Sequence, residues 1–332
     1  MKKKQTKLVV IGGGTGLSTL LRGLKHHPFD ITAIVTVADD GGSSGRLRDD
    51  YDIPPPGDVR NVIAALSDVE PLVEQMFQYR FSASEELGGH SLGNLMLTAL
   101  TDITGDFNHA ISEMGKVLKV HGRVIPAANK KISLHAELED GSIIEGESKI
   151  PMAKKRINHV FLVPDDVKPL PEAIRAIKQA DYILIGPGSL YTSIIPNLLV
   201  KDIGEAVVRA KGHKIYVCNL MTQKGETITY TAGDHVKAIN DHVGANFIDA
   251  ILVNDETLPN PVKELYKEEQ AEPVKFDVAM LESIGLEVIQ RDIATIRSDG
   301  TVRHNAINVA EWLVEYVKNY KNKISKKAII ES

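Results

Sequence analysis

The sequence predicts an α/β protein with a Rossmann-like, doubly wound and mostly parallel sheet, helices on both faces and a small antiparallel β insertion. Three observations lead to this fold class. Residues 7–11 are expected to form a short buried strand, whose apolar run from Leu8 to Ile11 is followed by glycines and then by leucines at helical spacing. Residues 31–37 form a second run, rich in β-branched residues. Later apolar runs alternate with helical patterns, as in a parallel sheet connected by helices.

The remaining elements follow in order from apolar periodicity. After the second strand the chain turns helical, and helices are expected at residues 59–66, 71–81, 91–103 and 107–120. In the second half, strands are expected at residues 159–163, 182–185, 214–218 and 247–253. The helices between them are expected at residues 171–179, 203–210 and 234–240, and an amphipathic helix at 308–320 follows.

Residues 130–150 interrupt the α/β pattern. Apolar and polar residues alternate from Ile132 to Leu138, and Asp140-Gly141 then predicts a hairpin turn. No internal repeat and no low-complexity linker divides the chain. We therefore expect a single α/β domain over residues 1–325 with a β-hairpin insertion at about residues 130–150, and a basic tail at residues 326–332.

The composition excludes several classes of protein. Acidic residues outnumber basic ones 44 to 39, for a net charge of −5, whereas a general nucleic-acid binder needs surplus Lys and Arg to neutralise phosphates. Cys218 is the single cysteine, which excludes a disulfide framework and a Cys-rich zinc site. No stretch approaches the ~18 apolar residues of a membrane span, and the apolar run behind the basic start is too short for a signal peptide. We expect a cytoplasmic protein.

The first candidate site is the glycine turn after the first strand, made of Gly12, Gly13, Gly14, Thr15 and Gly16. Glycines let the backbone approach a phosphate, and the helix that follows offers free N–H groups and a favourable dipole. A full dinucleotide fingerprint would have a third glycine or an alanine at position 17, where this chain has leucine. The turn predicts phosphate or nucleotide binding, with a tight turn that holds no ligand as the alternative.

A second glycine-rich segment follows the second strand, at the same edge of the predicted sheet. Its candidate binding residues are Asp39, Asp40, Gly41, Gly42, Ser43, Ser44 and Arg46. Backbone N–H groups, hydroxyls and a guanidinium together make a phosphate-binding nest. Asp39 or Asp40 could hold a ribose hydroxyl or a Mg²⁺ ion. A flexible surface loop is the alternative.

Two further candidate segments lie at expected helix starts. Asp58, Arg60 and Asn61 follow a Pro-rich lead, and Asp58 is also placed to cap the helix expected from residue 59. His90 and Asn94 are four residues apart and share a helix face, although a histidine there often has a purely structural role. Both segments are predicted to belong to the same ligand site.

A second strand-to-helix turn contains Gly186, Gly188, Ser189 and Ser193. Because the carboxyl ends of parallel strands share one edge of a sheet, this turn and the turn at residues 12–16 are expected to hold a nucleotide's phosphates between them. The alternative is a turn set by Pro and Gly alone.

Together the segments GGGTG, DDGGSSGR, GDVRN, GHSLGN and GPGSLYTSIIPNL resemble the gluconeogenesis-factor (YvcK-like) branch of the CofD-like family, over about residues 8–254. Two later segments are also similar to that branch: Tyr266 before Pro273-Val274, and Arg303-His304-Asn305 before the last helix. The resemblance implies that Tyr266 and Arg303 close over the uridine and sugar ends of a ligand. The alternative is that Tyr266 packs on the last helix and Arg303 caps a strand end.

The resemblance implies one of two activities. Some members of the family are 2-phospho-L-lactate transferases, which use a nucleotide-linked donor and Mg²⁺. The branch that this chain resembles more closely binds UDP-sugars and is needed for cell shape and cell wall synthesis during growth on gluconeogenic carbon sources. Candidate protein partners are regulators of cell wall synthesis and further copies of the chain, as a homo-oligomer.

No activated nucleophile stands out in the sequence, because Cys218 lies inside an apolar strand and no Ser-His-Asp spacing is evident. We therefore expect a UDP-sugar-binding regulatory protein that turns nothing over. The transferase stays open, since phosphoryl-type transfer depends mainly on positioning and electrostatics, with Arg46 and Arg60 on phosphate. An NAD-dependent oxidoreductase is the lesser alternative, and NAD could also occupy the site as a surrogate ligand.

Overall fold

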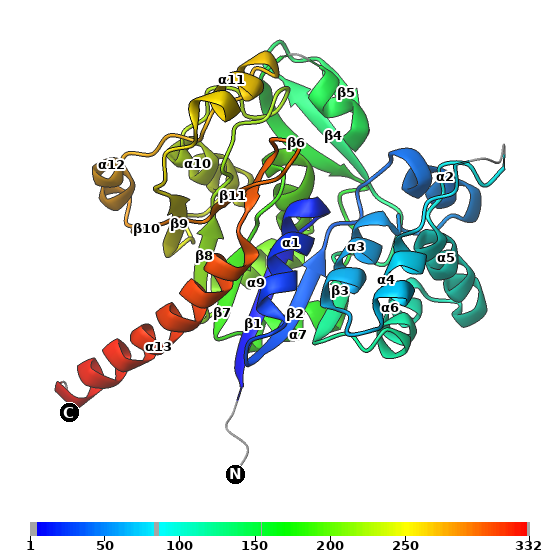
Figure 1. The fold of residues 1–332 in the computed structure, drawn as a ribbon, viewed down its shortest axis with the longest axis horizontal. Coiled ribbons are helices and arrows are strands. Elements are labelled where there is room, and N and C mark those ends of the chain that lie inside the picture. The colour runs from blue at the N-terminus through cyan, green and yellow to red at the C-terminus, as the bar shows by residue number, and fades with distance from the viewer. Residues whose placement is uncertain (1–4, 83–85, 154, 331–332) are drawn as a thin grey trace.

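A seven-stranded parallel sheet forms the centre of the fold (Figure 1). The computed structural model describes residues 5–82, 86–153 and 155–330. All neighbouring strands of the sheet are parallel. In spatial order they are β3 (Arg123–Pro126), β2 (Phe29–Val35), β1 (Thr6–Gly12), β7 (Tyr182–Ile185), β8 (His213–Val217), β9 (Ala250–Asn254) and β10 (Glu287–Arg291). The predicted Rossmann-like fold is confirmed.

The order of the strands reverses between β1 and β7. From β1 the chain runs outward through β2 to β3, and it then returns to β7 on the other side of β1 and runs outward to β10. Right-handed connections in opposite directions place their helices on opposite faces of the sheet. Accordingly, α1 (Gly14–Leu24) lies in front of the sheet and α9 (Lys201–Arg209) behind it in Figure 1. In such sheets, ligands bind outside the carboxyl ends of the strands at this point of reversal.

The other helices complete the two faces and one edge of the sheet. On the front face, α1 packs against α3 (Gly57–Leu66) and against the C-terminal helix α13 (Ala306–Ile330). Behind the sheet, α9 packs against α7 (Pro171–Gln179) and α8 (Ile195–Leu199). The remaining helices are α2 (Gly42–Tyr51), α4 (Pro71–Gln78), α5 (Leu92–Thr104), α6 (Phe107–Val117), α10 (Ala232–Val243), α11 (Asn260–Glu268) and α12 (Val278–Ser283). Residues 326–330, expected in a basic tail, continue α13, and residues 331–332 lie outside the described residues.

The predicted antiparallel insertion is a three-stranded sheet of β5 (Ile143–Glu145), β4 (Ser133–Leu138) and β6 (Ile157–Val163), in that order. The prediction of a parallel strand at residues 159–163 was therefore wrong, because β6 pairs antiparallel with β4. Buried and exposed residues are interleaved along β6, whereas all four residues of β7 are buried. That difference in burial is typical of a strand with one solvated face against one in the middle of a parallel sheet.

Several elements were not predicted, among them α2, the two edge strands of the main sheet, and the elements α8, α11, α12, β11 (Ala294–Ile296) and β12 (Val302–His304). The segment expected as a glycine-rich loop after the second strand turns into helix α2 at Gly42, although the sequence of α2 is mostly polar. Strands β3 and β10 form the two edges of the main sheet. With four and five residues, and with charged or proline residues among them, they are too short and too polar for apolar periodicity to identify them.

One large hydrophobic core surrounds the main sheet, and a small second cluster lies beside its carboxyl edge. The second cluster is made of Met221, Leu258, Val262 and Val302, with Tyr266 packed against it. It supports the hairpin of β11 and β12. No helix in the described ranges combines the length and the hydropathy needed to cross a membrane.

Candidate functional site

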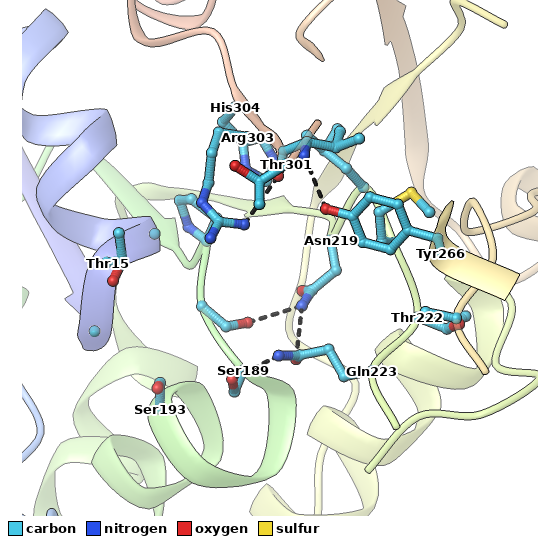
Figure 2. Close-up of a pocket in the computed structure, with 18 of the residues that line it drawn as sticks. Thr15, Ser189, Ser193, Asn219, Thr222, Gln223, Tyr266, Thr301, Arg303 and His304 are labelled. Atoms are coloured by element: carbon cyan, nitrogen blue, oxygen red, sulfur yellow. Dashed lines mark hydrogen bonds between the residues drawn. The ribbon is translucent and has the colours of Figure 1, made fainter. Parts of the chain in front are cut away.

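A pocket of about 770 Å³ opens at the carboxyl edge of the sheet, where the strand order reverses (Figure 2). Four segments line it: the first turn of α1, the turn after β7, the segment that follows β8, and a C-terminal wall from α11 and β12. The predicted site residues in this lining are Gly13, Gly14, Thr15, Gly16, Gly188, Ser189, Ser193, Tyr266 and Arg303.

The two strand-to-helix turns touch each other through their backbones. A Cβ on Gly16 would lie 3.0 Å from the carbonyl oxygen of Pro187, and one on Gly188 would lie 3.3 Å from that of Gly13. This contact arises because β1 and β7 are neighbours in the sheet and end at the same level. Gly14 has a φ of +62°, which favours glycine at the position that opens α1. Where the two turns meet, the pocket is therefore lined by backbone atoms of glycines, which have no side chains to cover them.

Asp58 holds the glycine turn from outside the pocket and does not cap its own helix, so the predicted capping role was wrong. Helix α3 begins at Gly57 without a side-chain cap, and the Oδ2 atom of Asp58 accepts a 2.7 Å hydrogen bond from the Gly14 N–H. Burial, and next the charge of Asp39, raises the pKa of Asp58 to about 7. One N–H group at the start of α1 is thus already paired with a carboxyl group.

Acidic side chains gather on the β2 side of the glycine turn. Burial, followed by the charges of Asp39 and Asp58, raises the pKa of Glu147 to about 8. The Asp39 and Asp40 carboxylates accept 2.9 Å hydrogen bonds from the backbone N–H groups of Gly41 and Ser148. Among the described residues, no three or more His, Cys, Asp or Glu side chains form a group that could hold a metal ion. Because Mg²⁺ is usually held by only one or two carboxylates together with phosphates of the ligand, the site expected at Asp39 or Asp40 stays a prediction.

The other predicted site residues lie outside the lining of this pocket. Ser43, His90 and Asn94 form a buried network, in which the Ser43 hydroxyl lies 3.0 Å from both the His90 Nδ1 and the Asn94 Nδ2. Arg46 donates to the carbonyl of Gly88 at 2.5 Å. The residues outside the lining are Gly12, Asp39, Asp40, Gly41, Gly42, Ser43, Ser44, Arg46, Asp58, Arg60, Asn61, His90, Asn94 and Gly186.

Tyr266 and Arg303 face the pocket from its C-terminal wall. The Tyr266 hydroxyl accepts a 2.8 Å hydrogen bond from the Val302 N–H, so Tyr266 packs against β12 and not on the last helix. The Arg303 Nη1 donates to the carbonyl of Val302 at 3.0 Å, and the buried Nε has no partner among the described residues. His304 is structural, because its Nε2 lies 3.0 Å from the Cys218 carbonyl and burial lowers its pKa to about 4.

Sequence reasoning missed the segment after β8, from Asn219 to Lys224, which forms the wall opposite α1. Its Asn219 and Gln223 side chains reach the turn after β7, with 2.9 Å bonds to the Gly188 carbonyl and the Ser189 hydroxyl. The signal was present, since the polar residues Asn219, Thr222, Gln223 and Lys224 follow directly after the apolar strand at residues 214–218. The rule that ligands bind at the carboxyl ends of parallel strands applies to this segment as well.

The pocket combines cationic and hydrogen-bonding groups suited to an anionic ligand. Arg303 and Lys224 supply positive charge, and the start of α1 supplies N–H groups and a favourable dipole. Glu268 and Glu269 line the pocket at the end of α11, where their carboxylates could accept from hydroxyl groups. Within the described lining, no hydroxyl is paired with a histidine base, because the one histidine, His304, is bonded to Cys218. The arrangement is suited to binding.

The sheet and its pocket define a doubly wound α/β protein with a ligand site at the reversal of strand order. The profile of the family 2-phospho-L-lactate transferase CofD matches residues 8–294. The chain belongs to the CofD family, in the branch of the gluconeogenesis factors.

Relatives and a solved structure are similar along almost the whole chain. The gluconeogenesis factor of Bacillus subtilis is 60% identical over 315 residues, which is 95% of this chain and 99% of the relative. The gluconeogenesis factor of Listeria innocua is 49% identical over 97% of this chain and 98% of its own length. A crystal structure of a Bacillus halodurans protein matches with a TM-score of 0.92 at 57% identity, covering 94% of this chain and 100% of that one.

Proposed function

We propose that this chain binds a UDP-sugar in the pocket at the reversal of strand order and acts as a regulatory protein. The observation that carries this proposal is the meeting of two strand-to-helix turns with Arg303 and Tyr266 around one pocket. Its volume of about 770 Å³ lies within the usual range for small-molecule sites. The name gluconeogenesis factor, given to the relatives, supports a role during growth on gluconeogenic carbon sources. We extend this to cell shape and cell wall synthesis, with regulators of wall synthesis as partners.

In the proposed complex, the diphosphate lies against the first turn of α1 and the Ser189 to Ser193 turn. Arg303 offers a planar fork of donors to the phosphate oxygens, and its unpaired Nε supports this role. The Tyr266 ring offers a stacking face to the uracil or the sugar. The carboxylates beside Tyr266 accept hydrogen bonds from sugar hydroxyls.

A transferase of the 2-phospho-L-lactate kind is the second candidate function. It is supported by the name of the matching family and by the acidic side chains of Asp39, Asp58 and Glu147 beside the glycine turn. We favour the regulatory function because relatives that match almost the whole chain are named gluconeogenesis factors. NAD is a candidate surrogate ligand, since its pyrophosphate is chemically similar to that of a UDP-sugar, and the oxidoreductase is the least supported alternative.

The proposal is tested by calorimetric titration of the full chain with UDP-glucose, GDP and NAD, each with and without Mg²⁺, followed by chromatography of the recovered ligand. The expected result is binding of UDP-glucose in preference to NAD, with the sugar nucleotide recovered intact after hours. Steady release of UMP, or transfer of a phosphoryl-linked group to an added acceptor, would overturn the regulatory function in favour of the transferase.

A further inference from the structure

A series of hydrogen bonds connects β8 to the turn after β7 along the wall of the pocket, and Figure 2 shows the part from Asn219 to Ser189. The Tyr216 hydroxyl donates to the Asn219 Oδ1 at 3.2 Å. The Asn219 Nδ2 donates to the Gly188 carbonyl at 2.9 Å, and the Gln223 Nε2 donates to the Ser189 Oγ at 2.9 Å. The segment that sequence reasoning missed is thus bonded directly to a turn that it predicted.

The donor and acceptor of each hydrogen bond in this series follow from the chemistry of the groups involved. The Gly188 carbonyl is only an acceptor, so the Asn219 amide must turn its NH₂ group toward it and its oxygen toward Tyr216. The same NH₂ group lies 3.5 Å from the Gln223 Oε1. Gln223 therefore faces Asn219 with its oxygen and Ser189 with its own NH₂ group. The bonds that connect Tyr216, Asn219, Gln223 and Ser189 are therefore each donated in the direction of Ser189, and the Asn219 amide donates a second bond to Gly188.

These donor directions determine where the proton of the Ser189 hydroxyl can point. Because its oxygen accepts from Gln223, the proton must point to another acceptor, and within the described residues the hydroxyl makes no further hydrogen bond. Ser189 lines the pocket beside the bare backbone of the α1 turn. Its hydroxyl is therefore a donor prepared for an acceptor in the pocket, and a donor of this kind bonds most strongly to an ionised oxygen.

We propose that Asn219 and Gln223 are positioning residues, which orient the Ser189 hydroxyl as a donor to an anionic oxygen of the ligand. The pocket thereby distinguishes a phosphate-bearing ligand from the neutral nucleoside. This inference rests on the proposed function, since it takes a nucleotide-linked ligand to be bound in this pocket.

The test is a double-mutant cycle with Gln223→Leu, Ser189→Ala and the two together, titrated with UDP-glucose, with uridine and with inorganic pyrophosphate. Gln290→Leu, on the exposed edge strand β10, is the matched control. We expect Ser189→Ala to weaken UDP-glucose and pyrophosphate binding about tenfold, Gln223→Leu about three- to tenfold, and the double variant no more than Ser189→Ala alone. Uridine binding should be the same in all variants, because it offers no anionic oxygen. Circular dichroism and urea titration of each variant check that the fold is kept.

Equal affinity of Gln223→Leu and wild type for pyrophosphate would overturn the inference, and so would strictly additive effects or an equal loss of uridine binding. A wild-type chain that binds pyrophosphate but not UDP-glucose would contradict the proposed function alone, and the pyrophosphate cycle would still decide the role of Gln223. A chain that binds none of the three probes would overturn both.

Discussion

Replacing Tyr266 separates its two roles, as a support for the β11–β12 hairpin and as a contact for the ligand. In Tyr266→Phe the N–H of Val302, a residue only 4% exposed, loses its 2.8 Å partner. An orphaned buried N–H costs about 1–3 kcal/mol, and we expect about 1–2 kcal/mol because water can reach the bond from the pocket. Tyr266→Ala also removes a half-buried ring from the Met221 and Val302 cluster, which adds about 2 kcal/mol.

The free energy of unfolding is measured by urea titration with linear extrapolation. Tyr51→Phe is the matched control, because Tyr51 is 59% exposed and should change stability by less than about 0.5 kcal/mol. The expected order of stability is wild type, then Tyr266→Phe, then Tyr266→Ala. If Tyr266→Phe is as stable as Tyr51→Phe, the hydrogen bond to Val302 does not support the hairpin, and the reasoning fails.

Ligand affinity decides the second role. If the Tyr266 ring stacks on the ligand, Tyr266→Phe keeps UDP-glucose affinity within about threefold, whereas Tyr266→Ala loses about tenfold or more. Both titrations are made below the temperature at which either variant begins to unfold. Unchanged affinity in folded Tyr266→Ala would refute a ligand contact at this position.

Three further predictions concern Arg303 and Gly14 in the pocket lining and Glu226, which bonds to the segment after β7. Arg303→Ala should weaken the binding of UDP-glucose by about 1.5–3 kcal/mol, measured by calorimetry. The control Arg209→Ala, at an exposed position, should bind UDP-glucose as wild type does. Equal affinities of the two variants would show that Arg303 does not contact the ligand. Gly14→Val should abolish nucleotide binding, because its φ of +62° disfavours a branched residue and the added side chain enters the lining; tight binding by a folded variant would contradict this. Glu226 accepts a hydrogen bond from the Tyr191 N–H at 3.1 Å, and burial raises the pKa of its carboxyl group to about 7. The folded state therefore holds the Glu226 proton more tightly than the unfolded state does, and the free energy of unfolding falls as the pH rises from about 4.5 through 7. Glu226→Gln should therefore be more stable than wild type in urea titration at pH 8 and similar at pH 5, and an equal difference at both pH values would contradict the linkage.

Much of the fold could be predicted from local patterns. The strand at residues 182–185 and the helix at residues 171–179 have the same bounds in the structure, as β7 and α7. A fully buried strand shows a continuous apolar run, and an amphipathic helix shows apolar residues at helical spacing, so both can be recognised without their neighbours. Strand β6 was assigned to the wrong sheet because its own sequence does not specify its pairing partner.

The candidate site likewise has a part that local sequence patterns predict and a part that they do not. The sequence by itself determined the two glycine-containing turns, since a buried strand, a glycine turn and a helix start are local features and place free N–H groups at the end of a strand. Only the tertiary structure decided which groups meet there. Asp58 reaches Gly14 across 44 residues and Gln223 reaches Ser189 across 34, while Tyr266 and Arg303 close the far wall. These contacts depend on the order of the strands in the sheet, which brings distant segments to one edge, and local patterns contain no information about that order.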